Sequence, residues 1–142
     1  MAENEELSNY MARLQQYKQQ IEKLEEQSEL IQSAINDYKK SKITLEKMSE
    51  LDDETEMLIP IGGRTFINVD VSPKHTSNVL FDIGSGVVTQ KKTEDAVTKI
   101  DETIDALDDR KEQVSDMLEK LESEASELQN KAQQLYMQQQ QG

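Results

Sequence analysis

The sequence predicts an α+β chain in which two long helices form an antiparallel coiled coil and are joined through two tandem β-hairpins. Three observations predict this fold. The two ends of the chain carry apolar residues at alternating spacings of three and four, the period of a coiled-coil seam. The middle carries apolar residues at a period of two, the period of a strand, with glycines between the runs. We expect a helix in residues 1–51, the hairpins in 52–93, and a helix with a glutamine-rich tail in 94–142.

The composition fits long exposed helices better than a thick core. Charged residues make up 32% of the 142 residues, aromatic residues make up 4%, and the net charge is −13. The absence of cysteine excludes disulfides and thiolate metal sites and favours a reducing compartment, so we expect a cytoplasmic protein. No signal peptide or membrane span is expected, and an acidic chain offers no basic face to nucleic acid.

The first helix is expected to start at Asn4, a capping residue followed by the acidic Glu5 and Glu6. Ten of its twelve seam positions are apolar over more than five heptads. We expect the helix to end near Leu51, because the acidic residues that follow are disfavoured at the end of a helix. The seam positions are Leu7, Tyr10, Leu14, Tyr17, Ile21, Leu24, Ser28, Ile31, Ile35, Tyr38, Lys42 and Leu45.

The second helix is expected to be capped by Thr93, with Glu94 and Asp95 in its first turn. Eleven of its twelve seam positions are apolar, and the glutamine-rich tail after Met137 is expected to fray. The seam positions are Val97, Ile100, Ile104, Leu107, Lys111, Val114, Leu118, Leu121, Ala125, Leu128, Ala132 and Leu135.

The two seams together predict which residues meet. If the hairpins reverse the chain, positions whose numbers sum to 142 face each other, so Leu7 meets Leu135 and every a position meets a d position. The seam lysines, Lys42 and Lys111, are then expected to extend their ammonium groups out to solvent. With a rise of 1.5 Å per residue, the arm is about 58 Å long.

The middle segment is expected to form two short hairpins. Glycine pairs provide their turns, at Gly62-Gly63 and at Gly84–Gly86, because glycine adopts positive φ without steric cost. A segment of about 36 residues is too short to fold alone, and its outer strands have unpaired edges. The hairpins are therefore expected to complete a sheet or barrel built from several chains. The expected strands are Leu58–Ile61, Arg64–Val71, Val79–Ile83 and Val87–Lys91.

No group of residues points to catalysis, a metal or a cofactor. The single histidine, His75, is expected to be a turn residue, because no paired carboxylate or serine accompanies it. The glycine motifs do not precede a helix as a dinucleotide fingerprint requires. The acidic run 52–56 lacks the glycine and the spaced ligands of a calcium loop.

The free ends of the helices carry more apolar residues than the seam requires. Met11, Tyr136 and Met137 lie off the seam, beside seam residues near the chain ends. Methionine adapts to many apolar shapes, which suits a binding surface for varied partners. The alternative is that helix ends tolerate such residues, and on the residues alone both interpretations stay open.

The order helix, two hairpins, helix, with IPIGG opening the first hairpin and VLFDIGSGVVTQKK closing the second, resembles the α class of prefoldin subunits. The resemblance covers essentially the whole chain, and the short chain with a glutamine tail suits an archaeal member. It implies an α2β4 hexamer with β-class subunits, whose hairpins build a central double β-barrel. It also implies an ATP-independent chaperone that holds unfolded proteins at the tips of its coiled coils and passes them to a group II chaperonin.

Carried to this chain, the resemblance assigns two groups of residues. Oligomerisation falls on Ile59, Ile61, Phe66, Ile67, Val69, Val71, Val79, Phe81, Ile83, Val87 and Val88. Binding of unfolded proteins at the tip falls on Leu7, Tyr10, Met11, Leu14, Leu128, Leu135, Tyr136 and Met137. The alternative function is a structural coiled-coil tether or docking subunit with one defined partner. An enzyme is not expected, because no set of reactive residues is present.

Overall fold

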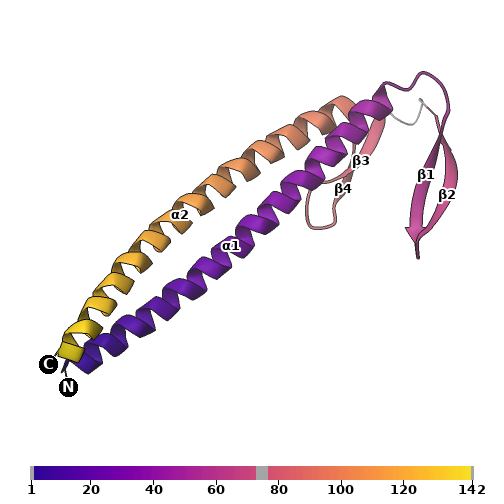
Figure 1. The fold of residues 1–142 in the computed structure, drawn as a ribbon. Helices are drawn as coiled ribbons and strands as arrows, with labels where there is room; N and C mark the ends of the chain where they lie inside the picture. The colour runs from indigo at the N-terminus through magenta and orange to yellow at the C-terminus, as the bar shows by residue number, and fades with distance from the viewer. Residues whose placement is uncertain (1, 73–76, 142) are drawn as a thin grey trace. The chain divides into compact units, whose positions relative to one another are not determined.

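A computed structural model describes residues 2–72 and 77–141. The order of elements, helix, two hairpins, helix, confirms the predicted fold (Figure 1). Two compact units are formed, one by Met1–Ala34 with Leu107–Gly142 and the other by Ile35–Ala106. The elements are α1 (Ala2–Ser49), β1 (Thr55–Gly62), β2 (Thr65–Val71), β3 (Asn78–Asp82), β4 (Val88–Lys92) and α2 (Thr93–Gln141).

Helix α1 differs from expectation at both ends. It begins at Ala2, so the prediction of Asn4 as the cap was wrong, and that residue lies inside the first turn. The helix ends at Ser49, two residues before the expected Leu51. The next two backbone N–H groups donate to carbonyls three residues earlier, at 3.2 and 3.3 Å. Such tighter bonds commonly close the last turn of a helix.

Helix α2 begins where it was expected and continues farther than expected. Thr93 is 6% exposed, and its backbone N–H donates to the carbonyl of Ser77 at 3.0 Å. The helix runs to Gln141, through the glutamine-rich tail after Met137 that was expected to fray. The side-chain amide of Gln140 donates to the hydroxyl of Tyr136 at 2.9 Å, one turn earlier, which supports the helical end.

The predicted seam is confirmed in the unit that holds both chain ends. Every expected seam position there is buried or half-buried, whereas most residues between them are exposed. The hydroxyl of Tyr17 donates to the carboxylate of Glu124 at 3.1 Å, and the ammonium of Lys111 donates to the side chain of Gln32. These pairs lie within one residue of the expected antiparallel register.

The second unit shows the same register at the other end of the helices. Ile35 and Ile100 are almost completely buried there. The ammonium of Lys42 lies 2.7 Å from a carboxylate oxygen of Asp101, again within one residue of the expected alignment. Both seam lysines therefore extend past the apolar layer to a polar partner, as predicted.

The four strands form two separate antiparallel hairpins. β1 begins at Thr55, three residues before the expected start, because its first residues pair with the end of β2. A bulge interrupts this ladder between Pro60 and Gly62. The other strand ends fall within one residue of expectation, which leaves Ile83 and Val87 just outside their strands.

The first turn lies one residue later than the Gly62-Gly63 pair suggested, whereas the second lies within Gly84–Gly86, as expected. The central residues are Gly63-Arg64 in the first hairpin and Ser85-Gly86 in the second, and all four have positive φ between 54° and 76°. Two positive φ values define the tight turn that matches the twist of paired strands. Each turn therefore uses one glycine and one residue that tolerates the left-handed conformation.

Candidate functional site

The hairpins expose most of the residues predicted for oligomerisation. Val69, Val71, Val79 and Phe81 are half-buried. The other seven side chains are between 43% and 59% exposed, although all are large and apolar. These seven are Ile59, Ile61, Phe66, Ile67, Ile83, Val87 and Val88. A monomer rarely leaves so many apolar side chains together at its surface, so the hairpins form an apolar surface suited to a partner.

The first hairpin, β1–β2, is apolar on both faces. Residues paired across an antiparallel ladder lie on the same face. Ile59 pairs with Ile67 on one face, and Pro60 pairs with Phe66 on the other. Leu58, on this second face, is 64% exposed and was missing from the predicted set. The unbroken apolar run of residues 57–61 was the signal that this strand serves two faces.

The second hairpin, β3–β4, has two different faces. Val79, Phe81, Thr89 and Lys91 share one face, and all four are half-buried. The opposite face carries Leu80, which is 77% exposed and was also missing from the predicted set. Its signal was again a continuous apolar run, residues 79–81, in place of strict alternation.

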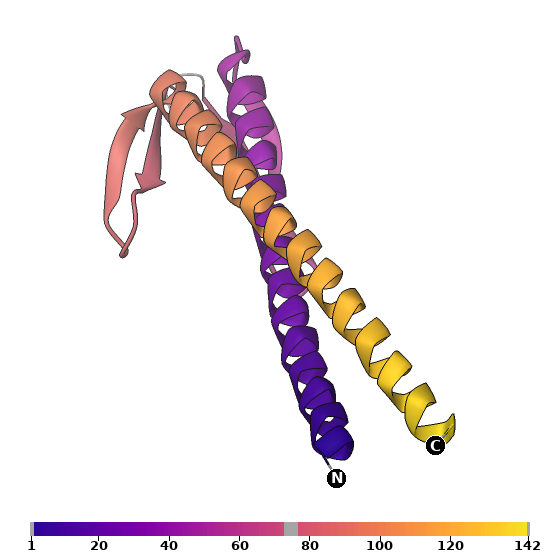
Figure 2. The same cartoon turned by 90° about the vertical axis from the view of Figure 1, so that its left-hand side faces the viewer.

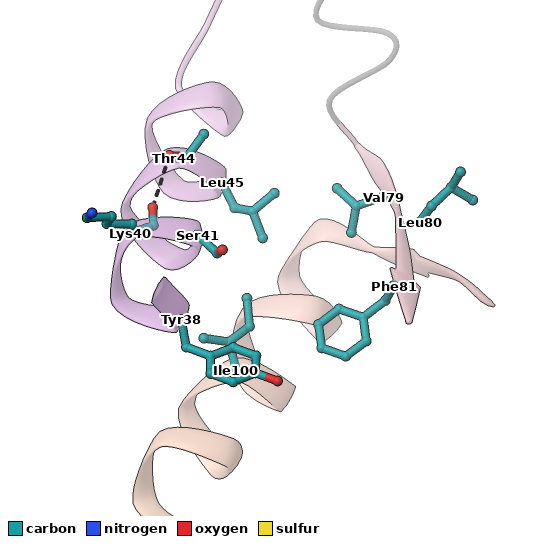
Figure 3. A pocket seen from close by; sticks show the side chains of 9 residues that line it. All are labelled: Tyr38, Lys40, Ser41, Thr44, Leu45, Val79, Leu80, Phe81 and Ile100. Atoms are coloured by element: carbon teal, nitrogen blue, oxygen red, sulfur yellow. Dashed lines mark hydrogen bonds between the residues drawn. The ribbon is translucent and has the colours of Figure 1, made fainter. Parts of the chain in front are cut away.

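A cavity of about 400 Å³ lies between β3 and the helices of the same unit (Figure 3). Val79 and Phe81 point into it from the strand, and Leu45 and Ile100 line it from α1 and α2 (Figure 3). The remaining lining residues are Tyr38, Lys40, Ser41, Thr44 and Leu80. The lining is therefore apolar at its centre, with hydroxyl groups along α1.

The tip of the first unit, formed by residues 2–14 and 128–141, presents a different apolar set. Met11, Tyr136 and Met137 are each more than half exposed. The seam residues predicted with them, Leu7, Tyr10, Leu14 and Leu135, are half-buried. Leu128 is only 6% exposed, so it offers little free surface. Figure 2 shows the two helices separating toward these free ends.

Tyr10 makes a hydrogen bond within α1 at the tip. The hydroxyl of Tyr10 donates to the carboxylate of Glu6 at 2.9 Å. This hydrogen bond to a carboxylate raises the pKa of Tyr10 above its ordinary value of 10.0, since losing the proton would bring two negative charges together. The shift moves the ionisation of Tyr10 farther from physiological pH, at which the side chain is neutral and adds its ring to the apolar tip.

Residues 2–72 and 77–141 hold no group of three or more histidine, aspartate or glutamate side chains placed to bind a metal ion. None of their helices is long and apolar enough to cross a membrane. The predicted turn residue His75 lies outside the described residues.

Comparison with known proteins identifies the family. The sequence model of the family described as "Prefoldin subunit" matches residues 17–140. The prefoldin subunit alpha of Archaeoglobus fulgidus is 33% identical over 97 residues, which is 68% of this chain and 69% of the relative. The prefoldin subunit alpha of Thermococcus onnurineus is 33% identical over 103 residues, which is 71% of this chain and 69% of the relative.

Two solved structures share the fold. The cryo-EM structure of filamentous PFD from Methanocaldococcus jannaschii matches 81% of this chain and 93% of its own, with a TM-score of 0.70 and 20% identity. The crystal structure of a prefoldin beta subunit from a Thermococcus strain matches 91% of this chain and 90% of its own, with a TM-score of 0.58 and 18% identity. With two long helices, two hairpins and these alpha-subunit relatives, the chain belongs to the prefoldin family and is a chaperone subunit.

Proposed function

We propose that this subunit captures unfolded proteins at the tip of its two helices, without ATP, and delivers them to a group II chaperonin. The observation that carries the proposal is the exposure of Met11, Tyr136 and Met137 where the helices separate. Unfolded proteins expose apolar segments of many shapes, and flexible, polarizable methionine side chains adapt to such variety. The mechanism is binding and release, so it needs no reactive group and no cofactor.

The proposed complex is an α2β4 hexamer in the cytoplasm, in which this chain joins β-class subunits through its hairpins. The exposed apolar side chains on both hairpins support this assembly, because association would remove them from water. Among residues 2–72 and 77–141, each strand pairs along one edge only, which supports it as well, since a second chain can continue each ladder.

Several weak tip contacts in one complex explain firm but reversible holding. Each tip offers only a few apolar side chains, so a single tip binds weakly. Tips that belong to one complex act at a high effective concentration toward the same unfolded chain. Loss of one contact at a time then allows stepwise release to the next chaperone.

Deletion of residues 1–11 and 132–142 tests this proposal. The deletion removes Met11, Tyr136 and Met137, and it leaves about four heptads of each seam, which is enough for a coiled coil. The truncated complex should assemble normally and lose most of its protection of unrelated unfolded proteins against aggregation without nucleotide. Light scattering measures both assembly and protection.

A matched control is Leu30→Ser, which removes a 67% exposed leucine from α1 outside the tip. This variant should protect as well as the parent. If a complex truncated on all its subunits still gives full protection, unfolded proteins bind outside the tips. A parent complex that binds one defined helix and protects no unfolded protein would instead support the tether.

A further inference from the structure

Two hollows lie on one face of the unit that holds both chain ends. The larger, of about 480 Å³, is lined by Leu24 of α1 and by Met117 and Leu121 of α2, with polar side chains around them. The smaller, of about 280 Å³, shares three of these lining residues and continues along α1 to Arg13. The two hollows therefore form one groove between the helices, called the arm groove below. Of its lining residues, only Arg13 falls within the tip.

The floor of the arm groove is apolar. Leu24 and Leu121 are seam residues that remain half-buried, so part of each side chain faces the groove. Met117 is 47% exposed, although it belongs neither to the tip nor to the hairpins. Apolar surface that is rimmed by polar residues is one mark of an interaction site. A partner that covers this floor would remove it from water.

The rim of the arm groove is basic, although the chain as a whole has a net charge of −13. Arg13, Lys23 and Lys120 line it, and none of them forms an ion pair within the described part of the chain. The acidic lining residue is Glu124, whose carboxylate already accepts a hydrogen bond from the Tyr17 hydroxyl at 3.1 Å. The groove is therefore a positive site on an acidic protein.

The helical repeat keeps the other acidic residues of these stretches away from the groove. Consecutive residues of a helix differ in direction by about 100°. Glu22, Glu119 and Glu122 are exposed, and they line neither hollow. Along α1, the positions that follow Arg13 at spacings of three and four, as far as Gln27, are three glutamines and a lysine. One face of the helix pair is thus free of acidic side chains where the groove runs.

The backbone around the groove determines the form of a partner. Both walls are α-helices, whose backbone N–H and carbonyl groups bond within each helix. An extended segment would find no strand edge here, so a partner has to satisfy its own backbone groups, as a helix does. The lining residues of α1 run from Arg13 to Leu24, about 17 Å, which matches about three turns of a partner helix.

We infer that the arm groove binds an amphipathic, acidic helix of a partner protein. Apolar side chains at spacings of three and four along that helix would cover the apolar floor, and carboxylates beside them would pair with the basic rim. Such rim charges orient a partner and speed its association, whereas the covered apolar area holds it. Nucleic acid is also negative, but its phosphates would leave the apolar floor without a partner.

Fluorescence anisotropy with the full-length chain and two labelled synthetic peptides tests this inference. Both peptides have about 15 residues, enough for the three turns, and carry leucine at spacings of three and four. One fills the other positions with glutamate and glutamine, and the second fills them with lysine and glutamine. The glutamate peptide should bind about tenfold or more tightly than the lysine peptide. Its affinity should fall as salt rises, because the rim charges are exposed.

Reversal of two rim charges should weaken binding of the glutamate peptide. Lys23→Glu together with Lys120→Glu turns two attractions into repulsions, so the dissociation constant should rise by about tenfold or more. The matched control is Lys18→Glu together with Lys47→Glu, which changes the net charge equally at two exposed lysines that line neither hollow. It should leave the dissociation constant within about twofold of the parent. Circular dichroism should show the same helix content for all three chains.

The floor is tested separately by Met117→Ser. This substitution removes an apolar side chain that the partner helix would cover, so the dissociation constant should rise by about fivefold. Ile43→Ser changes a 52% exposed residue of α1 outside the groove and should leave it unchanged.

Four results would overturn the inference. They are no binding of the glutamate peptide, equal binding of both peptides, unchanged binding after reversal of the rim charges, and an equal loss in the matched control. A single-stranded DNA probe that binds more tightly and displaces the peptide would also overturn it and identify a nucleic-acid site. If the peptide lowers the mass of the complex in light scattering, a second copy of the chain occupies the groove, and the inference fails.

Discussion

The hairpins and the tip both expose large apolar side chains, but they differ in the kind of residue. The exposed hairpin set is four isoleucines and two valines with two leucines and one phenylalanine, whereas the tip set is two methionines and a tyrosine. β-Branched side chains have few rotamers, so they present a fixed shape. Methionine has three rotatable bonds and adapts to its surroundings. This difference supports the proposal that the hairpins hold a permanent partner and that the tip holds many transient ones.

The backbone sharpens this difference. Within the described residues, the hairpins present open strand edges. The N–H and carbonyl groups of an open edge bind an added strand only in a defined direction and register. The tip is helical up to Gln141, so its backbone hydrogen bonds are mostly satisfied within the helices. Contacts at the tip therefore depend on side chains alone, which imposes no register on an unfolded chain.

The largest effect is expected from charges on the hairpins. Val69→Asp together with Phe81→Asp would bury two carboxylates without partners in an assembled body, which is strongly unfavourable. Light scattering should show dissociation of the complex. As a control, Ile43→Asp changes a 52% exposed residue of α1 and should leave the mass unchanged. Equal masses for the double variant and the parent would show that the hairpins are not the assembly surface.

A second substitution tests the stability of the seam without changing the hairpin surface or the tip. Ile35 is 1% exposed, and Ile35→Ala should lower the free energy of unfolding by about 2–5 kcal/mol because it leaves a cavity in the seam. Denaturant unfolding of the assembled complex measures this change. Ile43→Ala, an exposed neighbour on the same helix, should change it by about 0.5 kcal/mol or less. Similar losses for both variants would contradict the assignment of the seam.

Sequence alone predicted the helices well because their periodicity is long. Twelve positions in each helix repeat one spacing, so single exceptions such as Lys42 and Lys111 do not disturb the pattern. The equal length of the two seams also predicted the antiparallel register, which the contacts of Tyr17 and Lys42 confirm to within one residue. The capping residue Asn4 was mispredicted because capping is a local signal with several equivalent candidates.

The hairpins were harder to predict in detail. The first turn lies one residue later than the glycines suggested, since Arg64 adopts the positive φ that glycine usually provides. Leu58 and Leu80 were missed because strict alternation assigns one apolar face to each strand. At the tip, Met137 is 55% exposed whereas Leu128 is 6% exposed. The sequence assigned both to the binding surface, because the exposure of a side chain depends on how α2 packs.

A smaller effect is expected when the two exposed methionines of the tip are replaced by a stiffer apolar residue. Met11→Ile together with Met137→Ile keeps large apolar side chains at exposed helix positions but reduces their flexibility. The complex should still protect some unfolded proteins, while the range of proteins that it protects narrows. Aggregation assays with several unrelated proteins measure the range. Unchanged protection of all of them would show that apolar area, and not adaptability, distinguishes the tip from the hairpins.

The smallest effect is expected at Lys42, which belongs to neither surface. Its hydrogen bond to the Asp101 carboxylate raises the pKa of Lys42 above its ordinary value of 10.5. A lysine whose pKa is raised on folding contributes stability that is fully present below pH 10.5 and is lost as the pH rises through the raised value. Both side chains are partly exposed, so solvent screens the pair and the contribution is small.

Lys42→Met should therefore lower the melting temperature less than Ile35→Ala does, and the difference from the parent should shrink above pH 10.5 and in high salt. Lys47→Met, an exposed lysine without an ion pair among the described residues, is the control and should show no such dependence. A loss at Lys42 as large as at Ile35, or one that persists at alkaline pH, would mean that the lysine stem packs in the seam and that its charge is secondary.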